Sequence, residues 1–228
     1  MDATVVVLSK VPGALPVKTR LHAALGVQAA EALCVQMLAA TMELARSVDP
    51  QPVLAYSPPE ADLRALLHEL GPCRPLALAA TGGGACLAEA LERAARGQPL
   101  IALGGDAPDL PRALLLAALQ AVAHCDLALV PTPDGGFSCL ALTRPVARLE
   151  ELFTFGADDA RRSLLAAAAA RGLSATVLAP WPDVDTPEAV AALFARGWRP
   201  RIRARGERSE PTPRSSPPTT APPAAPLR

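Results

Sequence analysis

Short apolar runs alternate with longer amphipathic stretches along most of this chain. The runs are apolar at successive positions, as in parallel strands that are buried on both faces of a sheet. They lie at residues 4–9, 52–56, 76–80, 100–103, 127–131 and 176–179. Between them, apolar residues at helical spacing predict helices at 27–47, 59–70, 87–96, 111–123, 158–171 and 187–196. This alternation predicts an α/β fold with right-handed crossovers between strands.

One further apolar run, at residues 137–142, follows the Asp-Gly-Gly sequence at 134–136 closely. Asp-Gly is a strong signal for a tight hairpin turn. We therefore expect a strand here that runs antiparallel to its neighbour.

The composition divides the chain into two parts. Half of the 228 residues are apolar, which is enough for one domain with a sizeable core at residues 1–198. Residues 199–228 are rich in proline and arginine and hold almost nothing to bury, which predicts a disordered tail. The tail carries seven arginines and two glutamates, so that residues 1–198 hold 15 basic and 20 acidic residues. An acidic domain lacks the broad basic surface that binds nucleic acid.

The cysteines and the N-terminus favour a cytoplasmic protein. Five cysteines, an odd number with no Cys-x-x-Cys spacing, indicate free thiols rather than disulfides or a zinc site. The first residues show no basic segment before a long apolar one, so we expect no signal peptide. No apolar run reaches the ~18 residues that span a bilayer, so we expect no membrane insertion.

The loop after the first predicted strand holds the only two lysines among 22 basic residues, Lys10 and Lys18. Lys18 and Arg20 are two positions apart, so in an extended segment they would point the same way and could hold a diphosphate or triphosphate. The loop does not have the spacing of a P-loop. The alternative is a solvated loop in a chain that generally uses arginine.

A second loop, Gly104-Gly105-Asp106-Ala107-Pro108-Asp109-Leu110-Pro111, directly follows a predicted strand. The two glycines allow close approach of a ligand. Asp106 at the strand tip suits Mg²⁺, which takes one or two carboxylates and fills its other positions with phosphate oxygens and water. We interpret Asp109 instead as the N-cap of the following helix.

Two further loops hold carboxylates near predicted strand ends. The Asp134-Gly135-Gly136 sequence fits a plain turn and a ligand-binding loop equally well. Near the end of the domain, Thr186 or Asp185 can start the last helix, but neither role explains Asp183. A divalent metal would offset the repulsion between these two aspartates, so one of them is a candidate second metal contact. The three histidines are isolated, and no Ser-His-Asp or Cys-His pairing is evident.

Four motifs in this order carry a resemblance to a known family. They are Lys18-Thr19-Arg20-Leu21, the Gly-Gly-Asp-Ala-Pro-Asp-Leu-Pro loop at 104–111, Pro-Asp-Gly-Gly-Phe at 133–137 and Asp-Val-Asp-Thr-Pro-Glu at 183–188. Over residues 4–197 the chain resembles the bacterial glycosyltransferase-A-like family, also called radical-SAM/selenodomain-associated transferase 1. That family belongs with the nucleotide-diphospho-sugar transferases and is similar to phospholactate and molybdenum-cofactor guanylyltransferases.

The resemblance implies a Rossmann-like glycosyltransferase-A fold of three layers, with helices on both faces of a mostly parallel sheet. It implies that Lys18 and Arg20 face the donor phosphates and that Asp106, with Asp185 or Asp183, holds Mg²⁺ or Mn²⁺. The nucleotide or the acceptor would be bordered by Lys10, Gly104, Gly105, Asp134, Gly135 and Gly136.

The function expected from the resemblance is metal-dependent transfer from a nucleotide-activated donor, in the first place glycosyl transfer from a nucleotide sugar to a small acceptor. The first alternative is a guanylyltransferase-like nucleotidyltransferase that joins an NTP to a small phosphorylated or carboxylated acceptor. The second alternative is a non-catalytic nucleotide-binding protein, because residues 82–91 lack the Gly-Asp-Leu-Gly-Glu-Arg-like stretch that relatives often carry. The third alternative is an α/β domain without such a function, in which every acidic residue only caps a helix or forms a turn. The sequence predicts no oligomeric state.

Overall fold

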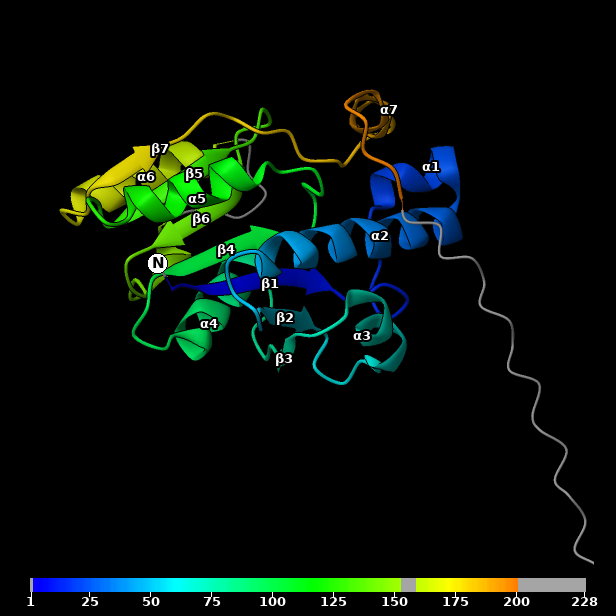
Figure 1. Cartoon of the computed structure of the whole chain (residues 1–228), viewed down its shortest axis with the longest axis horizontal. Helices are drawn as coiled ribbons and strands as arrows, with labels where there is room; N and C mark the ends of the chain where they lie inside the picture. Colours follow the sequence, from blue (N-terminus) through cyan, green and yellow to red (C-terminus); the bar gives the residue numbers. More distant parts are fainter. Residues whose placement is uncertain (1, 153–158, 201–228) are drawn as a thin grey trace, which may run out of the picture.

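The computed structural model describes residues 2–152 and 159–200, and these residues form one seven-stranded mixed sheet (Figure 1). The strands are β1 (Thr4–Lys10), β2 (Val53–Ser57), β3 (Arg74–Ala77), β4 (Leu100–Gly104), β5 (Leu127–Pro131), β6 (Phe137–Leu142) and β7 (Ala175–Val177). Their order across the sheet is β3-β2-β1-β4-β6-β5-β7. Only β6 runs antiparallel to its neighbours, β4 and β5. The mostly parallel sheet and the reversed strand at 137–142 are thus confirmed.

Helices connect the parallel strands, as the alternation predicts. The longer ones are α2 (Val27–Arg46), α3 (Arg64–Leu70), α4 (Gly83–Ala94), α5 (Arg112–Ala121), α6 (Ala160–Ala170) and α7 (Pro187–Ala195). Short turns of helix are η1 (Thr19–Leu21), α1 (His22–Leu25) and η2 (Leu149–Glu151). The helix expected at 59–70 begins only at Arg64, because the carboxylate of Asp62 accepts the Arg64 N–H at 3.0 Å and closes a local turn. The expected start of α6 at residue 158 lies outside the described residues.

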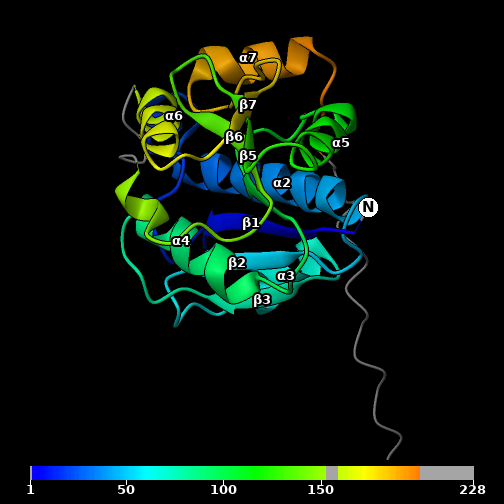
Figure 2. The same cartoon turned by 90° about the vertical axis from the view of Figure 1, so that its left-hand side faces the viewer.

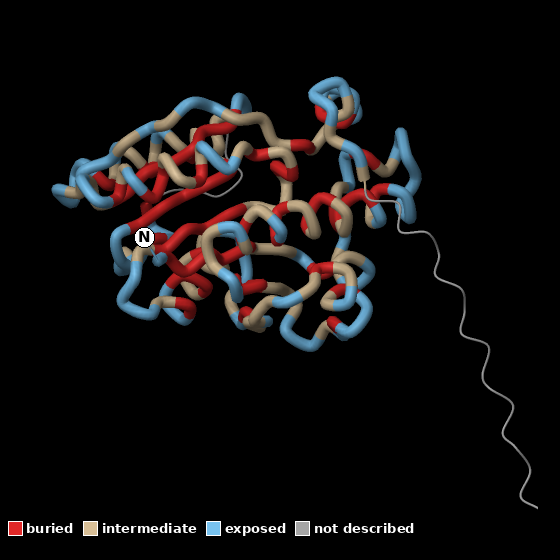
Figure 3. Tube along the Cα trace, viewed as in Figure 1, coloured by how far each residue is buried: buried red, intermediate tan, exposed pale blue. Residues whose placement is uncertain are grey.

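The sheet separates two apolar layers, because side chains alternate between its faces along each strand. Val5 and Val7 of β1 face α2, α3 and α5, whereas Val6 faces α4 and α6. Figure 2 shows α4 and α6 on one side of the sheet and α5 on the other. The strands in the middle are the most buried part of the chain (Figure 3). The three-layer architecture is therefore confirmed.

A third, smaller apolar cluster fixes α7 to the first half of α2 (Figure 1). Leu21, Met37 and Leu193 are fully buried there, together with Val184 from the segment that precedes α7. This packing brings the residues before α7 next to the turn that follows β1.

The predicted tail at 199–228 lies outside the described residues except for its first two positions. Within residues 2–152 and 159–200, every helix is too short or too polar to cross a membrane. All five cysteines are free.

Candidate active site at the carboxyl edge of β1 and β4

Three segments that are distant in the sequence meet at one edge of the sheet. Strands β1 and β4 are parallel neighbours, so the loops after them start side by side. The loop after β1 carries Lys18, and Asp106 follows β4 by two residues. The segment before α7 crosses the same edge, where the Val184 N–H donates a 2.8 Å hydrogen bond to the carbonyl oxygen of Asp106. Asp185 is the next residue.

The ammonium group of Lys18 lies at the centre of this meeting point. Its Nζ is 2.5 Å from Oδ1 of Asp106 and 2.6 Å from Oδ1 of Asp185. It also donates to the carbonyl oxygen of Val184 at 2.8 Å. The Lys18 side chain is 5% exposed, whereas those of Asp106 and Asp185 are 50% and 39% exposed. A buried cation thus joins two carboxylates whose outer sides remain open to solvent.

The backbone at Lys18 turns its side chain inward. Lys18 has φ 49° and ψ 40°, a left-handed conformation that costs a residue with a side chain on the order of 1 kcal/mol. Its carbonyl oxygen accepts the Leu21 N–H at 2.8 Å, and Nε2 of His22 bonds the carbonyl oxygen of Val17 at 2.9 Å. Arg20 lies on the 3₁₀ turn and is exposed. The expectation that Lys18 and Arg20 point the same way is therefore wrong, because the segment is a tight turn rather than extended.

Charge and burial oppose each other at this cluster. Burial by itself would lower the pKa of Lys18, but the charges of Asp106 and Asp185 and the hydrogen bonds to them raise its pKa overall. Burial and the nearby charges of Asp134 and Asp185 raise the pKa of Asp183 to about 6. The negative charges near Asp183 thus gather at this edge of the sheet.

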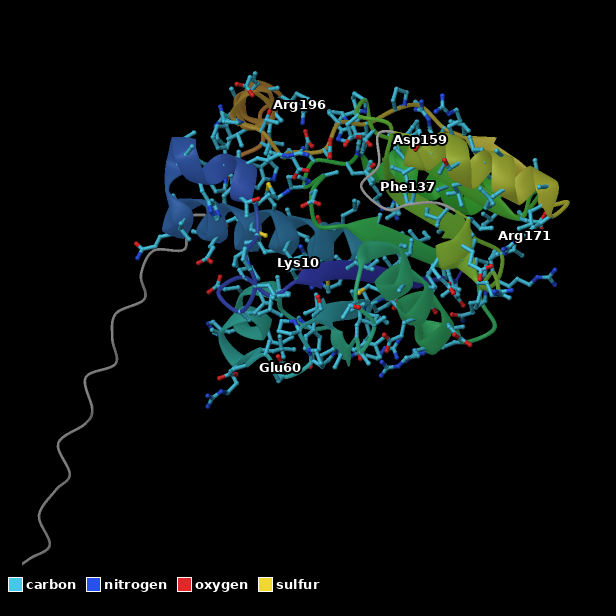
Figure 4. All side chains as sticks on the ribbon, turned by 180° about the vertical axis from the view of Figure 1, so that it is seen from behind. Lys10, Glu60, Phe137, Asp159, Arg171 and Arg196 are labelled. Atoms are coloured by element: carbon cyan, nitrogen blue, oxygen red, sulfur yellow. The ribbon has the colours of Figure 1, made fainter. Side chains whose placement is uncertain are left out.

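A cavity of about 870 Å³ opens beside the cluster. One wall is apolar and includes Leu8, Leu15 and Pro58, and the loop after β3 at residues 78–83 forms another part. Six of the candidate residues line the cavity: Lys10, Lys18, Gly104, Gly105, Asp106 and Asp185. Lys10, at the end of β1, is labelled in Figure 4.

Comparison with known families now places the chain. Residues 38–155, more than half of its length, match the family model described as "Uncharacterized protein conserved in bacteria (DUF2064)". The chain belongs to this family. No curated protein sequence matches the DUF2064 chain significantly.

Solved structures of transferases share its fold. A protein from Desulfovibrio desulfuricans G20, assigned to the nucleotide-diphospho-sugar transferases, is 25% identical with a TM-score of 0.76, covering 86% of this chain and 88% of that chain. CMP:2-keto-3-deoxy-manno-octonic acid synthetase complexed with CTP is 17% identical with a TM-score of 0.54, covering 86% and 99%. A cytidylyltransferase from Leptospira borgpetersenii is 12% identical with a TM-score of 0.56, covering 85% of each chain. At their low identities the last two show a common fold alone.

The Asp134-Gly135-Gly136 sequence of this DUF2064 protein forms a tight turn, and the Gly135 carbonyl oxygen also accepts the Arg161 N–H of α6 at 2.9 Å. Oδ1 of Asp134 accepts hydrogen bonds from Oγ1 of Thr132 at 2.5 Å and from the Gly136 N–H at 3.1 Å. Gly135 has φ 95°, a conformation that favours glycine. These contacts explain all three residues as a turn, and a ligand role for them stays a prediction.

The interpretation of Asp109 as a helix cap is wrong. Helix α5 has Pro111 at its N-cap, with no side-chain capping bond. The carboxylate of Asp109 is bound instead by Nε1 of Trp181 at 3.1 Å and by Nε of Arg196 at 2.6 Å. The capping role of Thr186 in α7 is confirmed, since its Oγ1 accepts the Ala189 N–H at 3.3 Å. Asp185 is therefore not needed as a cap.

The side chains of this DUF2064 site suit a Mg²⁺ ion that also takes phosphate oxygens as ligands. They do not suit one held by protein ligands alone. Among the described residues, no group of three or more His, Cys, Asp or Glu side chains could hold a metal. Two carboxylates do approach one cation, the ammonium of Lys18. Mg²⁺ typically uses one or two carboxylates and takes its remaining ligands from phosphate and water. Asp106 and Asp185 would hold it, and the magnesium requirement stays a prediction.

Sequence reasoning missed the support of the loop after β3. The carboxylate of Glu89 in α4 accepts the Ala79 N–H at 3.2 Å and the Ala80 N–H at 2.7 Å, and the Arg93 guanidinium lies 2.5 Å from it. Both alanines line the cavity. The i,i+4 spacing of Glu89 and Arg93 was the available signal, but it is also typical of an ordinary exposed pair on a helix.

Proposed function

We propose that this protein is a metal-dependent transferase that binds a nucleotide-activated donor in the cavity beside Lys18. The observation that carries the proposal is the approach of Asp106 and Asp185 to a single cation at the wall of that cavity. A volume of about 870 Å³ lies within the range of pockets that hold small ligands, ~300–1,000 Å³. The transferase names of the structures with this fold support the reaction class.

The described residues supply binding and alignment rather than a nucleophile. A bound divalent cation would neutralise the charge that develops on the leaving phosphate. Asp106 and Asp185 would orient that cation, and the apolar wall at Leu8 and Leu15 suits the flat face of a base. Cys34 also lines the cavity, but burial raises the pKa of its thiol to about 11, so it is not available as a thiolate.

Glycosyl transfer from a nucleotide sugar is the reaction we favour, because the Desulfovibrio protein has both the higher identity and the higher TM-score of the three structures. In this reaction the bond between the anomeric carbon and the donor phosphate oxygen breaks. The acceptor oxygen forms the new bond and loses its proton to water, and a nucleoside diphosphate leaves. The small-molecule acceptor is not specified by the site.

Nucleotidyl transfer is the second candidate, favoured by the fold shared with a CTP-bound synthetase and a cytidylyltransferase. Here the acceptor oxygen attacks the α-phosphorus, the bond to the β-phosphate breaks, and pyrophosphate leaves. Arg20 and Lys10 would then be candidates for contacts with the outer phosphates.

The released group decides between the two reactions. Isothermal titration with NTPs and nucleotide sugars, with and without Mg²⁺, identifies the donor. A panel of small acceptors is then assayed separately for nucleoside diphosphate and for pyrophosphate. Tight Mg²⁺-dependent binding without either product across the panel would favour a non-catalytic nucleotide-binding protein. Absence of binding to any nucleotide would contradict the proposal.

We extend the proposal to the family subtype, the cellular location and the bounds of the domain. The four ordered motifs support the radical-SAM/selenodomain-associated subtype, and the free thiols support a cytoplasmic location. Residues 1–198 would form the transferase domain and 199–228 its tail.

A further inference from the structure

The ammonium group of Lys18 is already surrounded by oxygen atoms of the protein. An ammonium carries three N–H bonds, and three protein oxygens surround this one within 2.8 Å. Two of them belong to Asp106 and Asp185, and the third is the carbonyl oxygen of Val184. A lysine that binds phosphate in the way the resemblance implies would need to leave at least one of these partners.

We propose that the Lys18 ammonium occupies the position between Asp106 and Asp185 that a divalent cation would take, so that lysine and metal compete for the same carboxylate oxygens. The proposal deepens the transferase function and rests on it for the identity of the nucleotide. It makes Lys18 an internal substitute for the metal when no nucleotide is bound.

Distances and exposure support competition. The ammonium nitrogen is 2.5 and 2.6 Å from the two Oδ1 atoms, and a magnesium ion binds oxygens at about 2.1 Å, so a magnesium ion placed between the same two oxygens would need the space that the ammonium fills. The carboxylates are partly exposed on their outer sides, whereas the ammonium is buried behind them. A metal that approaches from solvent therefore meets carboxylates whose charge is already partly neutralised.

The competition links metal binding to nucleotide binding. Lys18 lines the cavity, so an ammonium released by the metal can reach a phosphate bound there without leaving the site. Each ligand would then make the other bind more tightly, and the coupling would be reciprocal. Metal alone should bind weakly, because nothing replaces the bonds that the displaced ammonium loses.

The first test measures Mn²⁺ binding by electron paramagnetic resonance in the absence of nucleotide. Lys18→Met should bind Mn²⁺ about tenfold more tightly than the unsubstituted protein, since it removes the competing charge. Arg64→Met is the matched control, because it removes a positive charge from a side chain that is 91% exposed and does not line the cavity. Its Mn²⁺ affinity should change by less than about twofold. Equal or weaker Mn²⁺ binding by Lys18→Met would overturn the proposal.

The second test uses the unsubstituted protein, so it does not depend on the variant folding. The chain has only two lysines, and Lys10 is exposed while the Lys18 side chain is 5% exposed. Acetylation followed by mass spectrometry therefore reports Lys18 against an internal reference. We expect slow acetylation of Lys18 without metal, faster acetylation with saturating Mn²⁺, and protection again when a nucleotide is added. Unchanged Lys18 protection at saturating Mn²⁺ would overturn the proposal.

These outcomes separate the two proposals. The competition between Lys18 and Mn²⁺ is measured without nucleotide and without turnover. A failed product assay would therefore not contradict the competition proposal. Turnover in a protein whose Lys18 stays protected at saturating metal would support the transferase and reject the competition.

Discussion

The indole nitrogen of Trp181 donates a 3.1 Å hydrogen bond to Oδ1 of Asp109, which lies 72 positions earlier in the chain. Oδ2 of the same carboxylate accepts a 2.6 Å hydrogen bond from Nε of Arg196, just after α7 (Figure 4). The Arg196 guanidinium also lies 5.8 Å from the Trp181 ring centre. Asp109 thus fixes both ends of the segment that contains Asp183 and Asp185.

Replacing Asp109 by alanine should destabilise the protein and weaken the site. The Asp109 side chain is 14% exposed, so removal of the carboxylate leaves the part-buried Trp181 N–H without this partner and ends the ion pair with Arg196, whose side chain is 29% exposed. We expect the free energy of unfolding to fall by about 1–3 kcal/mol, measured by urea denaturation. Nucleotide affinity with Mg²⁺ should fall as well, because Asp185 loses its anchor. Asp109→Asn should lose less, since its amide oxygen can still accept from Trp181.

Arg64→Ala provides the control for this prediction. The Arg64 guanidinium pairs with Asp62 at 2.6 Å, but the two side chains are 91% and 60% exposed, so solvent screens the pair, and the backbone N–H that Asp62 binds is kept. Its urea midpoint should match that of the unsubstituted protein. If Asp109→Ala showed the same midpoint, the carboxylate would not be holding the segment.

The sheet could be predicted from the sequence because burial on both faces leaves a direct pattern. Runs such as 100–103 and 127–131 are apolar at every position, and both are strands. Element ends were less predictable. The late start of α3 depends on one hydrogen bond to Asp62, and the early start of α4 lies in a run of glycines at 82–84.

The sequence predicts which residues form the site better than it predicts how their side chains are arranged. The topology brings Asp106 and Asp185 to one sheet edge, and rules on strand ends anticipate this. The inward turn of Lys18 depends on a left-handed backbone at a non-glycine residue, for which the sequence gives no signal. Asp109 fits a local capping rule, and its real partners are 72 and 87 positions away. Local spacing cannot reveal contacts of that range.

Asp106→Asn should abolish the dependence of nucleotide binding on Mg²⁺. The substitution keeps the size of the side chain and removes the charge that a divalent cation requires. Titrations with and without Mg²⁺ should then give the same dissociation constant. Glu92→Gln is the control, because Glu92 is exposed on α4 and neither it nor its chain neighbours line the cavity. A Mg²⁺ effect that persists in Asp106→Asn would remove this carboxylate from the metal site.

The carboxylate of Glu89 should make the protein sensitive to acid. Burial opposes its ionisation, but hydrogen bonds from the Ala80 and Ala79 N–H groups and the charge of Arg93 lower the pKa of Glu89 overall. A carboxyl group with a lowered folded-state pKa contributes stability above its unfolded pKa, about 4.3, and that stability is lost as the pH falls through the folded-state value. The loss therefore begins below about pH 5.

Glu89→Gln tests this contribution. Its urea midpoint should be lower than that of the unsubstituted protein at pH 7, and the gap should narrow toward pH 3.5. Nucleotide affinity should fall as well, because Ala79 and Ala80 form part of the cavity wall. A gap that stays constant between pH 7 and pH 3.5 would mean that the ionised form of Glu89 contributes nothing.

Gly136→Ala should destabilise the turn between β5 and β6. A Cβ at Gly136 would lie 3.0 Å from Oγ1 of Thr132 and 3.3 Å from Oδ1 of Asp134, two atoms that already bond each other. Making room means breaking that bond, at a cost of about 1 kcal/mol in the free energy of unfolding.

Gly84→Ala is the opposite case. Its Cβ would meet Glu150 at an ordinary 3.7 Å inside α4, so the substitution should stabilise the protein by about 0.5–1 kcal/mol. The midpoints of thermal or urea denaturation of the two variants should shift in opposite directions. A higher midpoint for Gly136→Ala would show that Thr132 and Asp134 do not hold the turn between β5 and β6.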